Sequence, residues 1–142
     1  MDEKAELIQQ WLTKACNDLR SARRLYSDRP PLLDTAAYHC QQAAEKALKA
    51  YLALHDVPFR KTHLLVPLLA DCEQLEPAFM ELAEATEVLT PFATAFRYPG
   101  DVSDPDPADV VEAIELAQIV LVFVLTRMPD VLNDDPSTPG QP

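Results

Sequence analysis

A chain of 142 residues with 48% hydrophobic and 25% charged residues is long enough to bury a core as one domain without disulfides or a structural metal. Its net charge of −11 argues against non-specific binding to nucleic acid, because backbone phosphates must be neutralised by bases. The charge is uneven, since residues 14–61 carry nine bases against five acids, whereas residues 101–142 carry nine acids against one arginine. A local basic face in the first half could therefore hold a phosphate or a short RNA.

The secondary structure is predicted to be all helical, because the chain has two glycines, thirteen prolines and few β-branched runs. Apolar residues at steps of three and four predict a first helix from Asp2 to Tyr26. Asp2, Glu3 and Glu6 lie in its first turns, and Arg20, Arg23 and Arg24 lie near its end, which agrees with the helix dipole. That agreement offers a purely structural explanation of the arginine cluster.

Prolines and capping residues mark the limits of the next two helices. A second helix is expected from residues 34–35 to residues 55–57, where a proline follows. A third helix, capped by Thr62, is expected to reach Leu75. Because Pro67 cannot lie comfortably in a helix interior, this helix either begins just before it or has an irregular first turn.

The fourth helix is expected to begin at Pro77, to kink at Pro91 and to continue to Tyr98. A loop of turn-forming residues over 99–107 precedes the last helix, which should reach Arg127. The centre of that helix, IVLVFVL, is apolar on every face, which favours a central helix or one in a subunit interface. This apolar run is too short to span a membrane.

Together these elements predict an all-α fold, an antiparallel bundle of four to five helices with a long loop before the last one. The predicted domain covers residues 1–128, and residues 129–142 are expected to form an acidic, proline-rich disordered tail. Cysteines at positions 16, 40 and 72 lack CxxC or metal-site spacing and are interpreted as buried, reduced thiols of a cytoplasmic protein. The polar opening MDEKAELIQQ predicts no signal peptide, and no metal or cofactor is expected.

The second predicted helix has two unlike sides. One side is small and apolar, which suits close helix packing, and the other is a stripe of His39, Gln42, Glu45, Lys46 and Lys49. The structural interpretation of the stripe is a solvated polar face, supported by the Glu45–Lys49 pair at i,i+4. The functional interpretation is a ligand site.

Four pieces of the sequence, taken in order, resemble the HEPN domain. They are HCQQAAEKALKAYL at residues 39–52, RKTHL at 60–64, FRYP at 96–99, and an acidic loop followed by a final apolar helix. The resemblance spans roughly residues 5–128. It implies a bundle of about five helices, usually a homodimer, from a prokaryotic gene that is often paired with a minimal nucleotidyltransferase in a two-component, toxin–antitoxin-like system.

The resemblance further implies nucleotide binding and, in many branches of the family, metal-independent RNA cleavage. Cleaving branches carry an arginine, four to six arbitrary residues and a histidine near the start of the last helix. Arg97 is followed by residues 98–104 without a histidine, and all three histidines of the chain precede it. The chain therefore resembles a branch without the RNase motif, and no catalytic residue is assigned.

A candidate ligand site follows from the polar stripe and the FRYP segment. A nucleotide requires cations for its phosphates and flat or hydrogen-bonding groups for its base. Competing structural roles are a pairing of Glu45 with Lys49 or Arg97, capping of a helix end by Arg97, and a structural role of His63 at the third helix. The predicted ligand-binding residues are His39, Gln42, Lys46, Lys49, Arg97, Tyr98 and Asp101.

Three functions remain open at this point. The first is a non-catalytic protein that binds nucleotide or short RNA and works with a nucleotidyltransferase partner. The second is an RNase toxin with a nonstandard site, such as His39 with Arg97. The third is a structural helical module that docks a partner protein.

Overall fold

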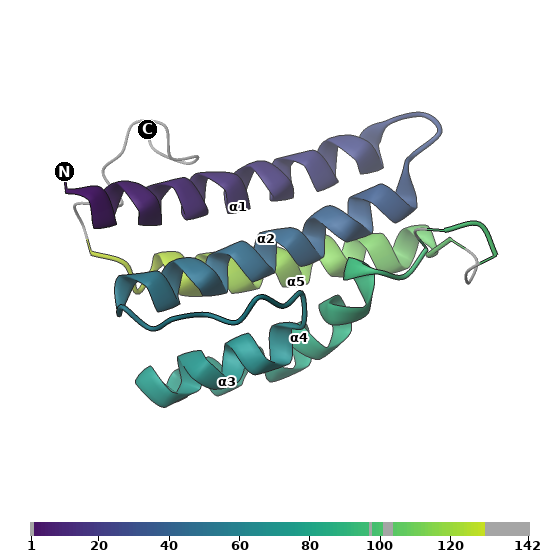
Figure 1. Ribbon diagram of the computed structural model, residues 1–142. Helices are drawn as coiled ribbons and strands as arrows, with labels where there is room; N and C mark the ends of the chain where they lie inside the picture. Colours follow the sequence, from purple (N-terminus) through teal and green to yellow (C-terminus); the bar gives the residue numbers. More distant parts are fainter. Residues whose placement is uncertain (1, 97, 101–103, 130–142) are drawn as a thin grey trace.

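The computed structural model describes residues 2–96, 98–100 and 104–129, which form an all-helical bundle without strands (Figure 1). This agrees with the predicted fold class. The predicted tail beyond residue 129 lies outside the described residues. The five α-helices are α1 (Glu3–Ser27), α2 (Leu33–Leu54), α3 (Leu65–Leu75), α4 (Ala83–Leu89) and α5 (Pro107–Leu125), and two 3₁₀ helices are η1 (Pro77–Leu82) and η2 (Thr90–Ala93).

The two longest helices, α1 and α2, run antiparallel and pack along their length (Figure 1). The Asp2 carboxylate caps α1 by accepting a 2.8 Å hydrogen bond from the amide of Ala5, as expected for an acid before a first turn. The buried face of α2 is built largely of alanines, whose small side chains let neighbouring helices approach closely.

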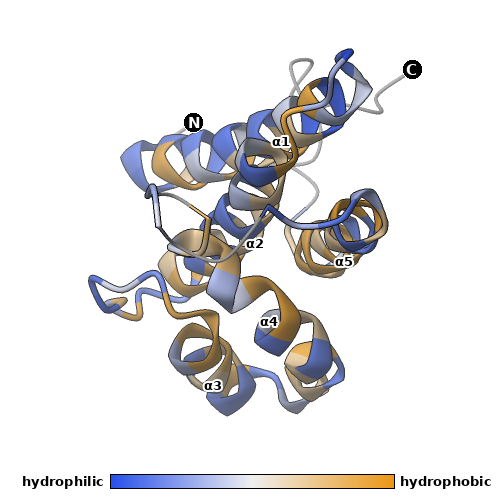
Figure 2. Ribbon diagram, turned by 90° about the vertical axis from the view of Figure 1, so that its right-hand side faces the viewer, coloured by the Kyte–Doolittle hydropathy of each residue, from blue (hydrophilic) through white to orange (hydrophobic). Residues whose placement is uncertain are grey.

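Helix α2 is the centre of the bundle. It packs against α1, α3 and α5, and Figure 2 shows it between these helices. As a result it has no fully solvated side, and Gln42, Glu45 and Lys49 of the polar stripe are buried. The solvated polar face considered from the sequence is therefore wrong for these three residues, because a side that is polar in sequence here meets other protein groups.

The start of α3 just before Pro67 agrees with one of the two predicted alternatives, but its N-cap is Leu64 and not the predicted Thr62, and the predicted end of the fourth helix is wrong. Helix α3 begins at Leu65, so that Pro67 falls in its first turn, where its missing N–H is not required. The predicted fourth helix to Tyr98 is wrong, since it is divided into η1, α4 and η2 and ends at Ala93. Pro91 cannot donate a helical hydrogen bond, and Phe96 adopts a left-handed φ of 66° that a helix does not allow.

Helix α5 begins at Pro107 with a capping box, in which Asp106 and Asp109 bond each other's backbone amides. One side of the helix is buried, whereas Ile119 and Val122 are 52% and 47% exposed. The sequence predicted that this helix is central or lies in a subunit interface. Within the described part of the chain, other elements cover only one side of α5. Among the helices of the described segments, none is long and apolar enough to cross a bilayer.

Candidate functional site

One buried carboxylate joins α1 to the polar stripe of α2. Asp18 of α1 accepts a hydrogen bond through one oxygen from Lys46 Nζ, and its other oxygen lies 2.8 Å from His39 Nδ1. The Asp18 side chain is 11% exposed, against 27% for His39 and 21% for Lys46. Asp18 therefore fixes the orientation of two largely buried bases, and we call these three residues the Asp18 cluster.

Asp18 was not predicted as a site residue. Its signal is its place in the sequence, because it follows Ala15 by three residues and precedes Ala22 by four, and both alanines are fully buried. An acid on the apolar side of an amphipathic helix requires a partner, since a buried charge without one is costly. This position could have been used to pair α1 with the bases of α2.

A small pocket opens beside the Asp18 cluster. It has a volume of about 300 Å³ and is lined by Asp34, Thr35, Tyr38, His39 and Phe96. The Tyr38 ring lies edge-on to the His39 ring, with 5.6 Å between their centroids. The pocket thus combines two aromatic rings with an imidazole held on one side by Asp18, and we call it the α2 pocket. Such a set can stack on a planar base and hydrogen-bond a phosphate or sugar.

A second polar cluster, centred on Glu45, is structural. The Glu45 carboxylate accepts hydrogen bonds from Gln41 and Lys49 at 3.1 Å each, and lies 3.0 Å from His63 Nδ1. Burial raises the pKa of the Glu45 carboxyl, but the hydrogen bonds from His63, Gln41 and Lys49 outweigh it and lower the pKa below its ordinary value. Gln41 also donates to the His63 carbonyl at 2.8 Å, which ties the loop before α3 to α2.

The structure separates the seven predicted ligand residues into groups. His39 and Lys46 meet at Asp18, as described. Gln42 donates a hydrogen bond to the Gln41 side chain at 2.7 Å. The ammonium of Lys49 pairs with Glu45 and lies over the rings of Trp11 and Phe59. The polar groups of Gln42 and Lys49 therefore make buried contacts within the protein. Tyr98 is 68% exposed, whereas Arg97 and Asp101 lie outside the described residues.

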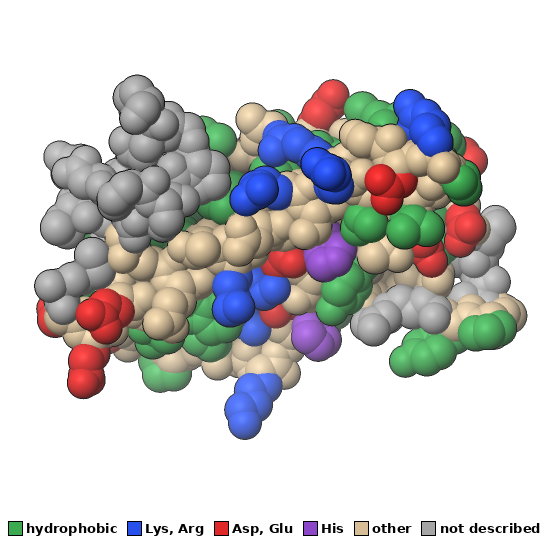
Figure 3. Space-filling model, turned by 90° about the horizontal axis from the view of Figure 1, so that it is seen from above, with side chains coloured by type: hydrophobic (Ala, Val, Ile, Leu, Met, Phe, Trp, Pro, Cys, Tyr) green, Lys and Arg blue, Asp and Glu red, His purple; other side chains and the backbone are tan. Residues whose placement is uncertain are grey.

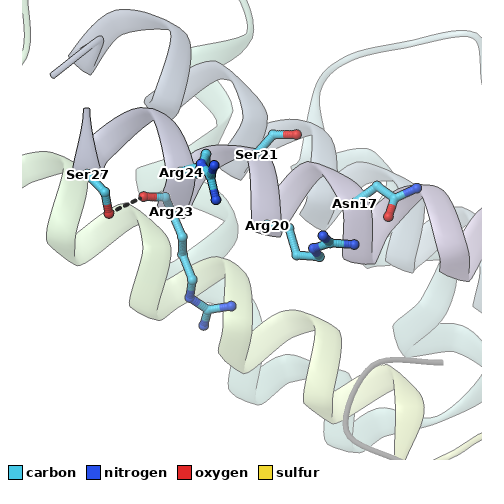
Figure 4. Close-up of a pocket in the computed structure, with 6 residues that line it drawn as sticks. All are labelled: Asn17, Arg20, Ser21, Arg23, Arg24 and Ser27. Carbon is cyan, nitrogen blue, oxygen red and sulfur yellow. Dashed lines mark hydrogen bonds between the residues drawn. The ribbon is translucent and has the colours of Figure 1, made fainter. Parts of the chain in front are cut away.

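Basic side chains also gather on the outer side of α1. Figure 3 looks onto this helix and shows two histidines with mixed charges at the middle of the face, with a separate basic group above them. A hollow of about 660 Å³ there is lined by Asn17, Arg20, Ser21, Arg23, Arg24 and Ser27 (Figure 4). Among the described residues no group of three or more His, Cys, Asp or Glu side chains is placed to hold a metal ion.

A family model for the HEPN domain matches residues 8–127, and the chain therefore belongs to the HEPN domain family. The crystal structure of TT1696 from Thermus thermophilus is 29% identical and superposes with a TM-score of 0.73, over 85% of this chain and 98% of that one. The crystal structure of ST0689, an archaeal HEPN homologue, is 28% identical with a TM-score of 0.67, over 84% and 96% of the two chains. Comparison with curated protein sequences gives no match.

Proposed function

We propose that this HEPN protein binds a nucleotide, or the end of a short RNA, in the α2 pocket and does not cleave it. The observation that carries the proposal is the position of His39, which lines the pocket together with Tyr38 and Phe96 while Asp18 holds its Nδ1. The family is generally associated with nucleotides or RNA, and the pocket offers two aromatic rings and an imidazole to such a ligand. A volume of about 300 Å³ lies at the lower end of small-molecule sites, which favours a mononucleotide-sized ligand.

The roles of the pocket residues follow from their chemistry. The rings of Tyr38 and Phe96 would flank the base, since aromatic stacking accepts any nucleobase. His39 would hydrogen-bond the phosphate or sugar through its second nitrogen, while Lys46 adds positive charge beside it. Because Asp18 pairs with Lys46, the field of the ammonium is largely cancelled at a distance. The electrostatic attraction of Lys46 for the ligand therefore has a short range.

Two features of the sequence support binding without cleavage. Arg97 lacks the following histidine of cleaving branches, and Arg127 has no histidine after it either. We further propose a minimal nucleotidyltransferase as the partner protein, in a two-component, toxin–antitoxin-like system in the cytoplasm. The support for that partner is membership of the family, and co-purification of the two proteins from cells that express both tests it.

The binding proposal is tested by calorimetric titration of the purified protein with nucleoside mono-, di- and triphosphates. The variant His39→Asn keeps an amide N–H where Nδ1 bonds Asp18 but removes the second ring nitrogen. We expect it to weaken nucleotide binding at least tenfold with little change in melting temperature. Lys61→Ala, an exposed base in a loop, is the matched control and should bind like the wild type. Equal affinity of the wild type and His39→Asn would contradict the proposal.

A second candidate function is RNA cleavage at a nonstandard site. The Asp18–His39 pair favours it, because a carboxylate on one imidazole nitrogen is how many enzymes orient a histidine as general base. This function predicts RNA cleavage by the purified protein in the presence of a chelator, lost in His39→Asn. RNA that stays intact during prolonged incubation at high enzyme concentration would rule it out.

We also propose that two copies of the chain associate through the outer side of α5. A hollow of about 690 Å³ there is lined by the apolar side chains of Ile119, Val122 and Phe123 together with polar and charged residues, among them Glu81, Glu115 and Arg127. A two-fold contact needs a surface that complements itself, and this one carries apolar groups together with charges of both signs.

A further inference from the structure

The arginine surface on the outside of α1 is not explained by ion pairs with the other described residues. Its six lining residues, given above, include three arginines and no acid. Arg20 and Arg24 are exposed and form no ion pair within the described part of the chain, whereas Arg23 reaches across to the side chain of Gln118 on α5. Figure 4 shows Arg20 and Arg24 along the same stretch of α1.

The helix dipole accounts for only part of this surface. Its effect falls off within the last helical turn, and of the three arginines only Arg24 lies in that turn. Arg20 and Arg24 are one turn apart, and like charges at this spacing destabilise a helix by about 0.2–0.5 kcal/mol. A charge pattern that costs stability in the free protein is expected where an anion binds.

We infer that this arginine surface binds the phosphate backbone of single-stranded RNA. Four helical residues rise about 6 Å, so that the guanidinium groups of Arg20 and Arg24 can contact successive phosphates of one strand. Asn17, Ser21 and Ser27 line the same hollow and supply neutral donors for phosphate oxygens or ribose hydroxyls. The inference rests on the proposed function in taking a nucleic-acid phosphate as the ligand.

The character of the lining favours RNA over an acidic protein. A protein interface is anchored by buried aromatic or aliphatic side chains, and every residue that lines this hollow is polar or charged. Contacts to a nucleic-acid backbone need only charge and hydrogen-bond donors. The net charge of −11 disfavours binding of the strand to the acidic remainder of the protein.

Arg20 follows Asp18 of α1 by two residues, and Asp18 contacts His39 of the α2 pocket, so that α1 connects the two sites. A strand whose terminal nucleotide enters the pocket would extend along α1 to reach the arginines. RNA should therefore bind more tightly than a mononucleotide, and only RNA should depend on Arg20 and Arg24.

The test is fluorescence anisotropy with a labelled single-stranded RNA of twelve nucleotides, over a series of salt concentrations. We expect the double variant Arg20→Ala/Arg24→Ala to raise the RNA Kd at least tenfold at low salt. The slope of log affinity against log salt should fall by about 1.4, since each phosphate contact on a single strand contributes about 0.7. Alanine is the strongest helix former, so α1 is retained in the variant, and a circular dichroism melt confirms this.

The charge-matched control is Arg60→Ala/Lys61→Ala, which removes two exposed bases from the loop before α3 and should leave the RNA Kd within twofold. No RNA binding by the wild type, or unchanged Kd and salt slope in Arg20→Ala/Arg24→Ala, would overturn the inference. Binding of polyglutamate of equal charge as tightly as RNA would also overturn it, in favour of an acidic protein.

Failure of the inference and failure of the proposed function give different results. In one outcome, mononucleotides bind the wild type and not His39→Asn, while the RNA Kd is unchanged in Arg20→Ala/Arg24→Ala. This result would support the α2 pocket and refute the inference about the arginine surface. If mononucleotides do not bind and RNA binding still requires Arg20 and Arg24, the proposed α2 pocket is refuted and the inference about the arginine surface is supported.

Discussion

Asp18 and His39 are 21 positions apart in the sequence, and their side chains meet with 2.8 Å between Oδ1 and Nδ1. The contact links α1 to α2 at a point where both helices are otherwise packed through apolar side chains. Because the same carboxylate also holds Lys46, removal of Asp18 affects two bases at once.

We expect Asp18→Ala to lower the free energy of unfolding by about 1–3 kcal/mol, because it leaves the largely buried ammonium of Lys46 without a partner. Urea denaturation measures this change. Lys46→Met introduced into Asp18→Ala should recover part of the loss, since it removes the unpaired charge. Asp28→Ala at the exposed end of α1 is the control and should change stability by less than about 0.5 kcal/mol. The single variant Lys46→Met completes the comparison. If the stability losses of Asp18→Ala and Lys46→Met add up to the loss in the double variant, the pair does not interact.

Acid should destabilise the protein through Glu45. Its pKa in the folded protein lies below the ordinary value of 4.5, because hydrogen bonds from His63, Gln41 and Lys49 outweigh the effect of burial. A carboxyl group with a lowered folded pKa stabilises the protein above its unfolded pKa and loses this contribution as the pH falls through the folded value. Urea unfolding at several pH values should show stability falling below pH 4.5.

The variant Glu45→Gln tests the origin of this acid sensitivity. It should be less stable than the wild type at pH 7 but should lose less stability between pH 5 and pH 3, since it cannot be protonated. Glu84→Gln, at an exposed position on α4, is the control and should follow the wild type at every pH. A pH dependence in Glu45→Gln as steep as that of the wild type would assign the effect to other carboxyl groups.

The cysteines should react slowly in the folded protein. Burial raises the pKa of Cys40 and of Cys72 to about 12, and raises that of Cys16, so that little thiolate is present at neutral pH. We expect a thiol reagent such as dithionitrobenzoate to label the native protein at least a hundredfold more slowly than the protein in urea. Rapid labelling of one thiol without denaturant would show that the helices around it open locally.

Ile119→Asp tests the proposed association through α5. A charge at this exposed apolar position should convert a dimer into a monomer, as measured by light scattering after gel filtration. The melting temperature of the separated monomer should be little affected, since the side chain is 52% exposed. Val66→Asp, at an apolar position on α3 that is 48% exposed, is the control and should leave the mass unchanged. A wild-type protein that is monomeric at high concentration would refute the association.

Local sequence signals predicted most of the fold. Spacing of apolar residues placed α1, α2 and α5 to within a few residues, and the structure adds that Asp2 and Asp106 cap the starts of α1 and α5. The predicted extension of the fourth helix to Tyr98 was wrong. Pro91 lacks the amide for a helical hydrogen bond, and the left-handed φ of Phe96 is incompatible with a helix.

The site was harder to predict, since the sequence shows which residues share a side of a helix but not what that side meets. Gln42 and Lys49 belong to the same stripe as His39, yet α2 is central and the bundle buries them. Asp18 and the pocket side chain of Phe96 come from distant segments. Only the packing of α1 and of the segment after η2 against α2 brings them to the stripe.

The alanine-rich surface of α2 has a consequence for how the helices are aligned. Small, similar side chains distinguish one relative position of two packed helices from another less sharply than large side chains do. The Asp18 cluster exists at one alignment only, and a shift of about 5.4 Å would leave its charges buried and unpaired. We expect the Asp18–Lys46 pair to fix the register of α1 against α2. Many apolar substitutions in α2 should be tolerated as long as this pair is kept.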